Sequence, residues 1–330
     1  MRKLLLVAIC LLVLFCGCEK EAESTLDSAD DKLIVVGFSQ VGAESEWRVA
    51  NTESIKATLT EENGYVLFYE DARQEQENQI RAIRTFIQQE VDYILFSPKV
   101  ETGWDSILLE AKKANIPVIV TDRYIESDVE GLFTAYIGSN FYSEGETAVL
   151  WLEDFLKKQS RTEEPVHIVH IQGTIGSTAQ IGRTAALEQA VSKHPNWQLV
   201  AQQCGDFTRA KAYEVMGSIL EDTKDIDVVY CENDGEALGA IAALEEAGLV
   251  CNPVDGVIVI SFDATRLGLQ YCLEQKIALN VECNPLQGPY VDEIIKKLER
   301  KEPIGRIRYV EETQFDCFTI TQEMIDIRDY

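Results

Sequence analysis

Apolar runs and helical segments alternate along most of the chain. Runs such as 32–39 and 116–122 are apolar almost throughout rather than alternating with polar residues. Strands of a parallel sheet that helices cover on both faces have this pattern. Between the runs lie segments such as 76–89, where Ile80 and Ile83 recur at helical spacing. The pattern predicts an α/β protein built from βαβ units.

The alternation occurs twice. The first series of strands runs from 32–39 to 132–140, and a second series begins after a helix near 143–158. The strand 277–285 ends the second series, a further helix follows, and a single late strand covers 307–315. Two series of similar length predict two lobes of similar construction, each with a parallel sheet.

The first residues carry an export signal. A basic start, MRK, precedes the apolar run LLLVAICLLVLF, and Gly17 stands directly before Cys18. The run is too short for a comfortable membrane span, and the small residue before the cysteine is typical of a lipoprotein signal. We expect residues 1–17 to be a signal peptide and 18–31 to comprise the lipidated Cys18 and a disordered tether. An uncleaved anchor and an ordinary secreted protein are the alternatives.

The net charge limits the possible binding partners, and the cysteines raise the question of disulfides. The chain has 30 basic and 56 acidic side chains, a net charge of −26, which disfavours a nucleic-acid partner because the surface repels phosphate. An exported protein can form disulfides, and six cysteines beyond the tether allow about 15 pairings, with buried free thiols as the alternative. These cysteines are Cys204, Cys231, Cys251, Cys272, Cys283 and Cys317.

Common enzyme motifs are absent. The chain has no GxxxxGK[ST], HExxH or GxSxG motif. His167 and His170 lie three residues apart on a predicted strand, so they point to opposite faces and do not share a metal. The glycine-containing stretch 172–183 lacks the spacing of a nucleotide-binding loop and is interpreted as a tight turn. We expect no catalytic activity, cofactor or metal.

Polar side chains follow almost every predicted strand, among them Asp122 with Arg123, and Asp263. Ligands of open parallel sheets bind outside the carboxyl ends of the strands, although each such residue taken alone is also an ordinary helix cap. Carboxylates, amides and guanidinium groups pair with hydroxyls, and aromatic rings pack on the apolar C–H faces of sugars. The set therefore indicates a neutral polyol as the ligand.

Several motifs together resemble periplasmic sugar-binding proteins of the ribose-binding type, the receptors of ABC importers, and within that family the galactofuranose-binding proteins. The resemblance covers 32 to about 326 and rests on stretches such as GFSQVGAESEWR, TGWDSILLEAKKANIPVIVTDR, GDFTRAKAYEVM and ECNPLQGP. It implies the type 1 periplasmic binding protein fold, two Rossmann-like lobes joined by a three-strand hinge. The first lobe would comprise 32–139 with 284–305, and the second 140–283 with 306–330.

The resemblance also implies a set of ligand-binding residues. Trp47 and Phe207 match rings that stack on the sugar, and the Trp47–Arg48 pair, where ribose-type proteins have two aromatics, disfavours ribose. Cys283 occupies the position of a hinge glutamine, so Glu282 or Asn284 is expected to contribute instead. The complete set is Glu44, Ser45, Trp47, Arg48, Asp122, Arg123, Asn140, Arg183, Phe207, Asn233, Asp263 and Asn284.

The expected function is capture of a monosaccharide, galactofuranose or a similar sugar, between the lobes by an extracytoplasmic, lipid-anchored monomer that delivers it to an ABC importer permease. Two alternatives stay open at this point. One is a sugar sensor subunit for a chemoreceptor or histidine kinase, and the other is a secreted carbohydrate-active enzyme.

Overall fold

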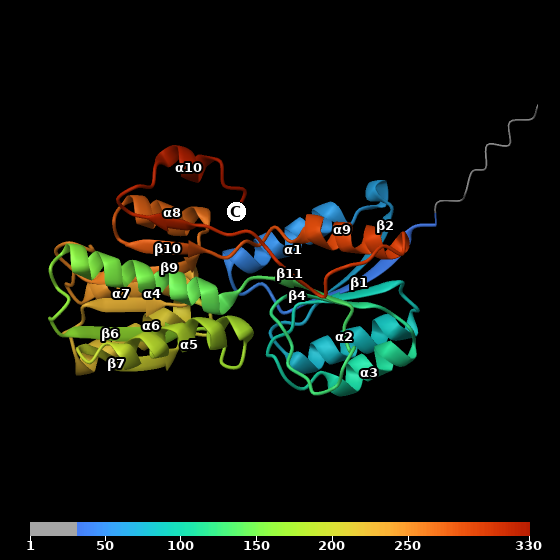
Figure 1. The fold of residues 1–330 in the computed structure, drawn as a ribbon, viewed down its shortest axis with the longest axis horizontal. Coiled ribbons are helices and arrows are strands. Elements are labelled where there is room, and N and C mark those ends of the chain that lie inside the picture. The colour runs from blue at the N-terminus through green and yellow to red at the C-terminus, as the bar shows by residue number, and fades with distance from the viewer. Residues whose placement is uncertain (1–31) are drawn as a thin grey trace, which may run out of the picture. The chain divides into compact units, whose positions relative to one another are not determined.

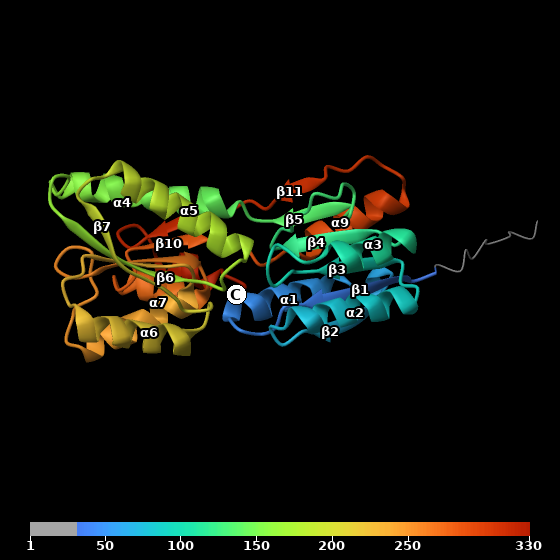
Figure 2. The ribbon, with the colours of Figure 1, turned by 90° about the horizontal axis from the view of Figure 1, so that it is seen from below.

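Two six-stranded sheets form the framework of residues 32–330, the part of the chain that this computed structural model describes (Figures 1 and 2). The predicted signal peptide, Cys18 and the tether lie outside the described residues. Each sheet is the centre of one lobe, and the two lobes together make up the unit Leu33–Tyr330. The predicted two-lobed α/β fold is confirmed.

The first lobe is built on the sheet with the strand order β2-β1-β3-β4-β5-β11, in which all neighbours are parallel. Its strands are β1 (Ile34–Gln40), β2 (Tyr65–Asp71), β3 (Tyr93–Phe96), β4 (Val118–Asp122), β5 (Ala135–Gly138) and β11 (Ile307–Tyr309). Its helices are α1 (Glu46–Thr58), η1 (Glu61–Asn63), α2 (Gln76–Gln88), α3 (Asp105–Lys113) and α9 (Gly288–Glu299).

The second lobe repeats this plan with the strand order β12-β10-β9-β8-β6-β7, parallel except for β12 against β10. Its strands are β6 (Val166–Gln172), β7 (Trp197–Cys204), β8 (Val228–Cys231), β9 (Ile258–Asp263), β10 (Leu279–Glu282) and β12 (Gln314–Asp316). Its helices are α4 (Phe141–Lys158), α5 (Thr178–Lys193), α6 (Arg209–Asp222), α7 (Asp234–Glu246), α8 (Arg266–Leu273) and α10 (Gln322–Asp326).

Both faces of each sheet are buried, which explains the continuous apolar runs. Along β3, Ile94 and Phe96 pack toward α2 and α3, whereas Leu95 packs with α1 and α9 on the other face. Along β6, Val169 and Ile171 pack toward α6 and α7 in the same alternating manner. Because side chains alternate across a strand, a strand covered on both sides needs apolar residues at every position.

Three crossing segments connect the lobes: 139–140, 283–287 and 310–313. The sequence predicted one strand over 307–315, but two strands form there, and they belong to different sheets. β11 pairs with β5 in the first sheet, and β12 pairs with β10 in the second. The last crossing therefore lies after Tyr309 and not at the expected boundary near 305. Strand pairing is interrupted between Tyr309 and Gln314, where the chain leaves the first sheet before it joins the second.

Among residues 32–330 the cysteines form no disulfide, and the two histidines of β6 lie in separate environments. All six cysteines between 32 and 330 are free thiols, five of them buried. His170 is buried against Glu232 at 2.9 Å, while His167 lies near Asp225 on the other side of the strand. The two imidazoles therefore have separate environments, as their spacing predicted. No helix within the described range has both the length and the apolar character that a bilayer span requires.

Gly37 in β1 tests the packing of the first lobe. A Cβ atom at this position would lie 2.4 Å from the Phe86 ring, so Gly37→Ala overpacks the interface between sheet and α2. We expect a loss of about 1–3 kcal/mol in the free energy of unfolding, measured by urea denaturation. The control is Gly217→Ala in α6, where a Cβ meets nothing within 4 Å and alanine favours the helix. Equal stability of the two variants would contradict this packing.

Candidate functional site

A pocket with about 300 Å³ of empty space lies between the carboxyl ends of the two sheets, partly open to solvent. The structure brings together all the predicted site residues except Asn140 and Asn284. The residues that line it are Glu44, Ser45, Trp47, Arg48, Asp122, Arg123, Phe141, Ala179, Arg183, Phe207, Asn233, Asp263 and Cys283. The position follows from topology, because parallel strands bring their carboxyl ends to one edge of each sheet.

Arg48 is the centre of a buried ionic network in the first lobe. Ser45 caps α1 by accepting a hydrogen bond from the Arg48 backbone, and this fixes the start of the helix beside the pocket. The guanidinium donates to Asp122 at 2.6 Å and to Glu44 at 3.0 Å, and it is only 3% exposed. Burial by itself lowers the pKa of Arg48, but the two carboxylates raise it above its ordinary value. Arg48 therefore stays charged.

Arg123 lies beside this network and leans toward the second lobe. It donates to the Lys99 carbonyl at 2.9 Å, and its guanidinium lies 5.3 Å from the centre of the Phe207 ring. Glu44 is 3.7 Å away. Burial and then the neighbouring Arg48 cation lower the pKa of Arg123. Asp122 is 3.8 Å away, so neither carboxylate accepts a hydrogen bond from Arg123, which leaves N–H groups of its guanidinium available for a ligand.

Arg183 occupies the equivalent position in the second lobe. Its Nε donates to Glu144 at 2.7 Å, and another nitrogen donates to the Glu232 carbonyl. Asp263 lies 3.9 Å from the guanidinium, and burial raises the pKa of that carboxyl well above its usual value despite this cation. The guanidinium also lies over the Phe262 ring, 4.6 Å from its centre. Contacts on several sides hold Arg183 in one orientation.

Aromatic rings from both lobes meet in the pocket. Trp47 and Phe207 belong to one buried apolar cluster with Phe141, Ala179 and Cys283. The Trp47 indole N–H donates to the Cys283 carbonyl at 2.6 Å, so a ring of the first lobe is tied to a crossing segment. This hydrogen bond holds the Trp47 ring in one orientation, so its apolar face points in a fixed direction.

Three residues of the pocket have a left-handed backbone: Asp122 at φ 60°, Phe207 at 58° and Asp263 at 100°. Asp122 and Asp263 end β4 and β9, and Phe207 lies in the loop between β7 and α6. Such conformations are unfavourable for residues other than glycine, and they concentrate at functional sites. Asn233 reinforces one of these turns, because its side chain donates to the Phe207 carbonyl at 3.1 Å while it caps α7.

Two predicted residues lie elsewhere. Asn140 is exposed and caps α4, where its side chain accepts from the Ser143 backbone at 3.2 Å. Asn284 lies in a crossing segment and uses its side-chain oxygen to accept from the Leu286 backbone. Both side chains stabilise local backbone and do not line the pocket. Sequence reasoning missed Phe141 as a pocket ring, since an aromatic at the start of a helix gives no distinctive signal.

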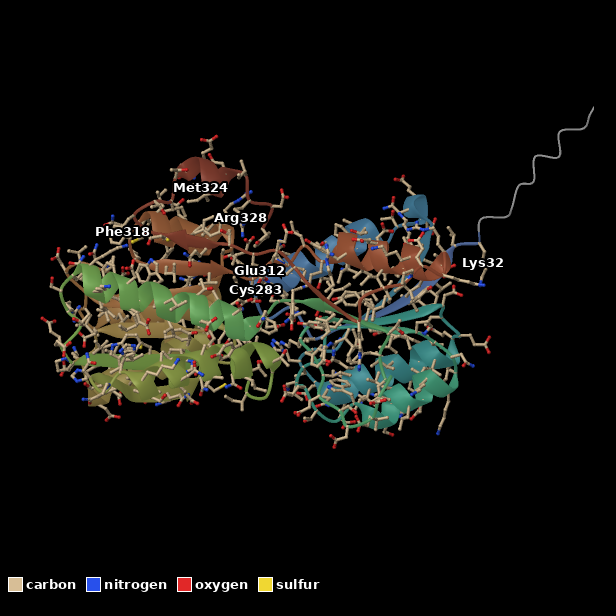
Figure 3. The ribbon with its side chains drawn as sticks, in the orientation of Figure 1. Lys32, Cys283, Glu312, Phe318, Met324 and Arg328 are labelled. Carbon is tan, nitrogen blue, oxygen red and sulfur yellow. The ribbon has the colours of Figure 1, made fainter. Side chains whose placement is uncertain are left out.

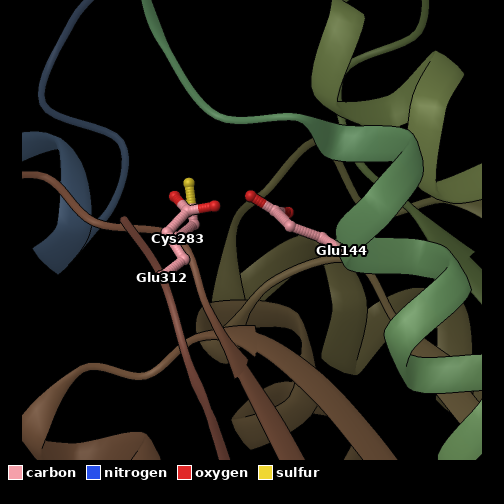
Figure 4. Close-up of side chains that lie close together, drawn as sticks. All are labelled: Glu144, Cys283 and Glu312. Carbon is pink, nitrogen blue, oxygen red and sulfur yellow. The ribbon is translucent and has the colours of Figure 1, made fainter. Parts of the chain in front are cut away.

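Glu144, Cys283 and Glu312 form a second cluster beside the crossing segments (Figure 4), and Figure 3 labels Cys283 and Glu312 in the whole molecule. Their nearest ligand atoms all lie within 4.8 Å of one another, and the Glu144 carboxylate points toward the other two. Within residues 32–330 these three are the only group that could hold a metal ion. Arg183 already occupies one oxygen of Glu144, and its positive charge opposes a cation there.

Proton sharing explains this cluster better than a metal does. Glu312 accepts hydrogen bonds from the Ser139 hydroxyl and the Asn284 backbone, and one oxygen of Glu144 is buried without a partner among the described residues. Burial and then the charge of Glu144 raise the pKa of Glu312 to about 9. Burial also raises the pKa of Glu144, against the attraction of Arg183. A protonated carboxyl supplies a donor that the two groups otherwise lack.

Comparisons with known proteins agree with this geometry. A family model described as a periplasmic binding protein domain matches residues 36–287. The galactofuranose-binding protein YtfQ of Escherichia coli K12 is 37% identical over 80% of this chain and 81% of its own length.

Two solved structures are also similar to the chain. One, from Mycobacterium smegmatis in complex with β-D-fucofuranose, has a TM-score of 0.82 and 42% identity over 89% of this chain and 93% of that one. The other, from Shewanella sp. ANA-3, is the periplasmic binding component of an arabinose ABC transporter bound to α- and β-L-arabinofuranose. It has a TM-score of 0.81 and 38% identity over 89% of this chain and 95% of that one.

Glu312 gives stability a specific pH dependence. Its carboxyl ionises near its ordinary pKa of 4.5 when unfolded but near 9 when folded, so the folded state holds an extra proton between these values. This contribution to stability is fully present below pH 4.5 and is lost as the pH rises toward 9. We expect Glu312→Gln to flatten the fall in the free energy of unfolding between pH 5 and 9, by up to about 1.4 kcal/mol per pH unit.

Urea denaturation at several pH values measures this effect. The control is Glu311→Gln, which removes a carboxylate from the exposed neighbouring position. Equal slopes for Glu312→Gln, Glu311→Gln and the unchanged protein would contradict a protonated Glu312.

Proposed function

The chain belongs to the family of periplasmic binding proteins, and from this membership we propose that it captures a monosaccharide between its two lobes and delivers it to an ABC importer. Members of this family bind solutes outside the cytoplasm and are not enzymes. The observation that carries the sugar proposal is the pocket itself, in which rings and buried ionic groups lie together.

The chemistry of the pocket fits a neutral polyol. Arg48 and Asp122 already compensate each other's charge, so a ligand bound there need not carry charge of its own. Asp122 uses one oxygen for Arg48 and Ser97, and its other oxygen accepts no hydrogen bond from residues 32–330. That oxygen can accept from a sugar hydroxyl while Arg123 or Arg183 donates to another. Trp47 and Phe207 supply faces for the C–H groups of the ring.

A furanose is the proposed form of the sugar. The named ligands of the similar proteins, galactofuranose, β-D-fucofuranose and L-arabinofuranose, are all five-membered rings. We propose that the ligand is galactofuranose or a close relative of it, and that it is bound by the pocket residues given above, without Asn140 and Asn284. We also propose that a lipid at Cys18 anchors the protein, that the protein is a monomer, and that it delivers the sugar to a permease.

A panel of monosaccharides tests the function directly. Binding to the folded state raises its melting temperature, so we expect D-galactose, D-fucose or L-arabinose to give a shift that D-ribose does not. Carbon-13 labelling of the bound sugar then distinguishes a furanose from a pyranose by the anomeric shift. Absence of binding to every sugar, or turnover of a glycoside by the purified protein, would overturn the proposal.

Two substitutions test the site. Trp47→Ala removes a buried stacking ring and is expected to weaken binding of the best sugar by about 1–3 kcal/mol. Asp122→Ala removes the hydroxyl acceptor and leaves Arg48 with one carboxylate, so we expect binding to be lost. Calorimetry measures both, with Trp151→Ala in α4 as the matched control, because Trp151 lies outside the pocket. Unchanged affinity in the Trp47 and Asp122 variants would refute the assignment.

A further inference from the structure

A second cavity, with about 500 Å³ of empty space, adjoins the pocket. The two spaces have part of their lining in common, so they lie on either side of the same side chains. The shared residues are Glu44, Ser45, Trp47, Phe207 and Asp263. The rings of Trp47 and Phe207, one from each lobe, therefore separate an inner space from an outer space. A group attached to an inner ligand on the side of these rings is therefore directed toward the second cavity.

The walls of the second cavity come unequally from the two lobes. The first lobe contributes only residues 44–47, at the start of α1. The second lobe contributes the first turns of α6, α7 and α8, including Arg209, Leu238 and Leu267. Leu238 is buried and Leu267 is partly exposed, so together they form an apolar surface that water reaches at one edge.

The polar groups of this cavity differ from those of the inner pocket. Asp234 is buried, but donors from Ser261, Thr265 and Asn280 already satisfy its carboxylate. Glu46 and Arg209 are exposed, come from opposite lobes, and have no ion pair or side-chain hydrogen bond within the described part of the chain. Glu46 and Arg209 thus give the exposed edge of the cavity a free acceptor and a free donor beside an apolar surface.

We propose that this cavity binds a second sugar unit, joined by a glycosidic bond to the monosaccharide in the inner pocket. The inference rests on the proposed function and extends it from monosaccharides to furanosyl disaccharides. Leu238 and Leu267 meet the C–H face of the second ring, and Glu46 and Arg209 bind its hydroxyls. Because this space is larger than the inner pocket and open at one edge, the second ring need not be fully enclosed.

Calorimetry with matched ligands tests this proposal. The probes are L-arabinose and D-galactose, each compared with the disaccharide of the same sugar in furanosyl linkage. We expect the disaccharide of the sugar that binds to have an affinity within about tenfold of the monosaccharide or higher. Leu267→Trp fills the outer cavity and should weaken the disaccharide more than tenfold while changing the monosaccharide less than twofold. Gln270→Trp is the control, because Gln270 lies on the same helix outside the cavity.

A milder variant keeps the test independent of folding defects. Arg209→Ala removes an exposed donor and should weaken only the disaccharide, by about threefold to tenfold. If the monosaccharide binds but the disaccharide does not, or if Leu267→Trp and Arg209→Ala leave disaccharide binding unchanged, the second-unit proposal is wrong and the proposed function stands. If no sugar of the monosaccharide panel and neither disaccharide binds, the proposed function itself fails, and the extension fails with it.

Discussion

Burial of guanidinium groups in the cleft is the constraint on which the rest of the site depends. An unpaired charge away from water is costly, so Arg48 and Arg183 each need carboxylates within hydrogen-bond distance. Those carboxylates come from other elements: Asp122 from the end of β4 and Glu144 from the first turn of α4. Each ion pair holds only if the strands and helices that carry its members are correctly placed. The fold and the pocket are therefore specified together.

The same contacts prepare the site before a ligand arrives. Arg183 is held by a carboxylate, a backbone carbonyl and the Phe262 ring, so its orientation does not have to be selected on binding. The indole of Trp47 is fixed in a similar way by the Cys283 carbonyl. Fixing rotamer-rich side chains in advance removes an entropic cost that binding otherwise carries. Selectivity among sugars then depends on hydroxyl geometry more than on adjustment of the protein.

Much of this arrangement could be predicted, and the failures have physical reasons. Strands buried on both faces leave a strong signal, and topology places their polar termini at one edge, which is why residues as distant as Asp122 and Asp263 were grouped in the pocket. Trp47 was placed there only by the family resemblance. The prediction of one strand over 307–315 was wrong because the apolar pattern of a sequence indicates which residues are buried but not which strand they pair with. Asn140 was predicted to bind the ligand but caps α4 instead, because asparagine is a common residue type in both roles. The proton shared near Glu312 depends on three crossing segments meeting, which local sequence does not reveal.

The return of α9 and β11 to the first sheet affects how the chain acquires its structure. α9 covers the same face of that sheet as α1, and β11 forms its edge. Domains commonly fold in order from the N-terminus as the chain emerges, yet here the first lobe lacks a covering helix and an edge strand until residue 309 is available. Its apolar face stays incomplete while β6 to β10 of the second lobe are being made. A chaperone that delays folding during biosynthesis would bind mainly to the exposed apolar face of this incomplete lobe.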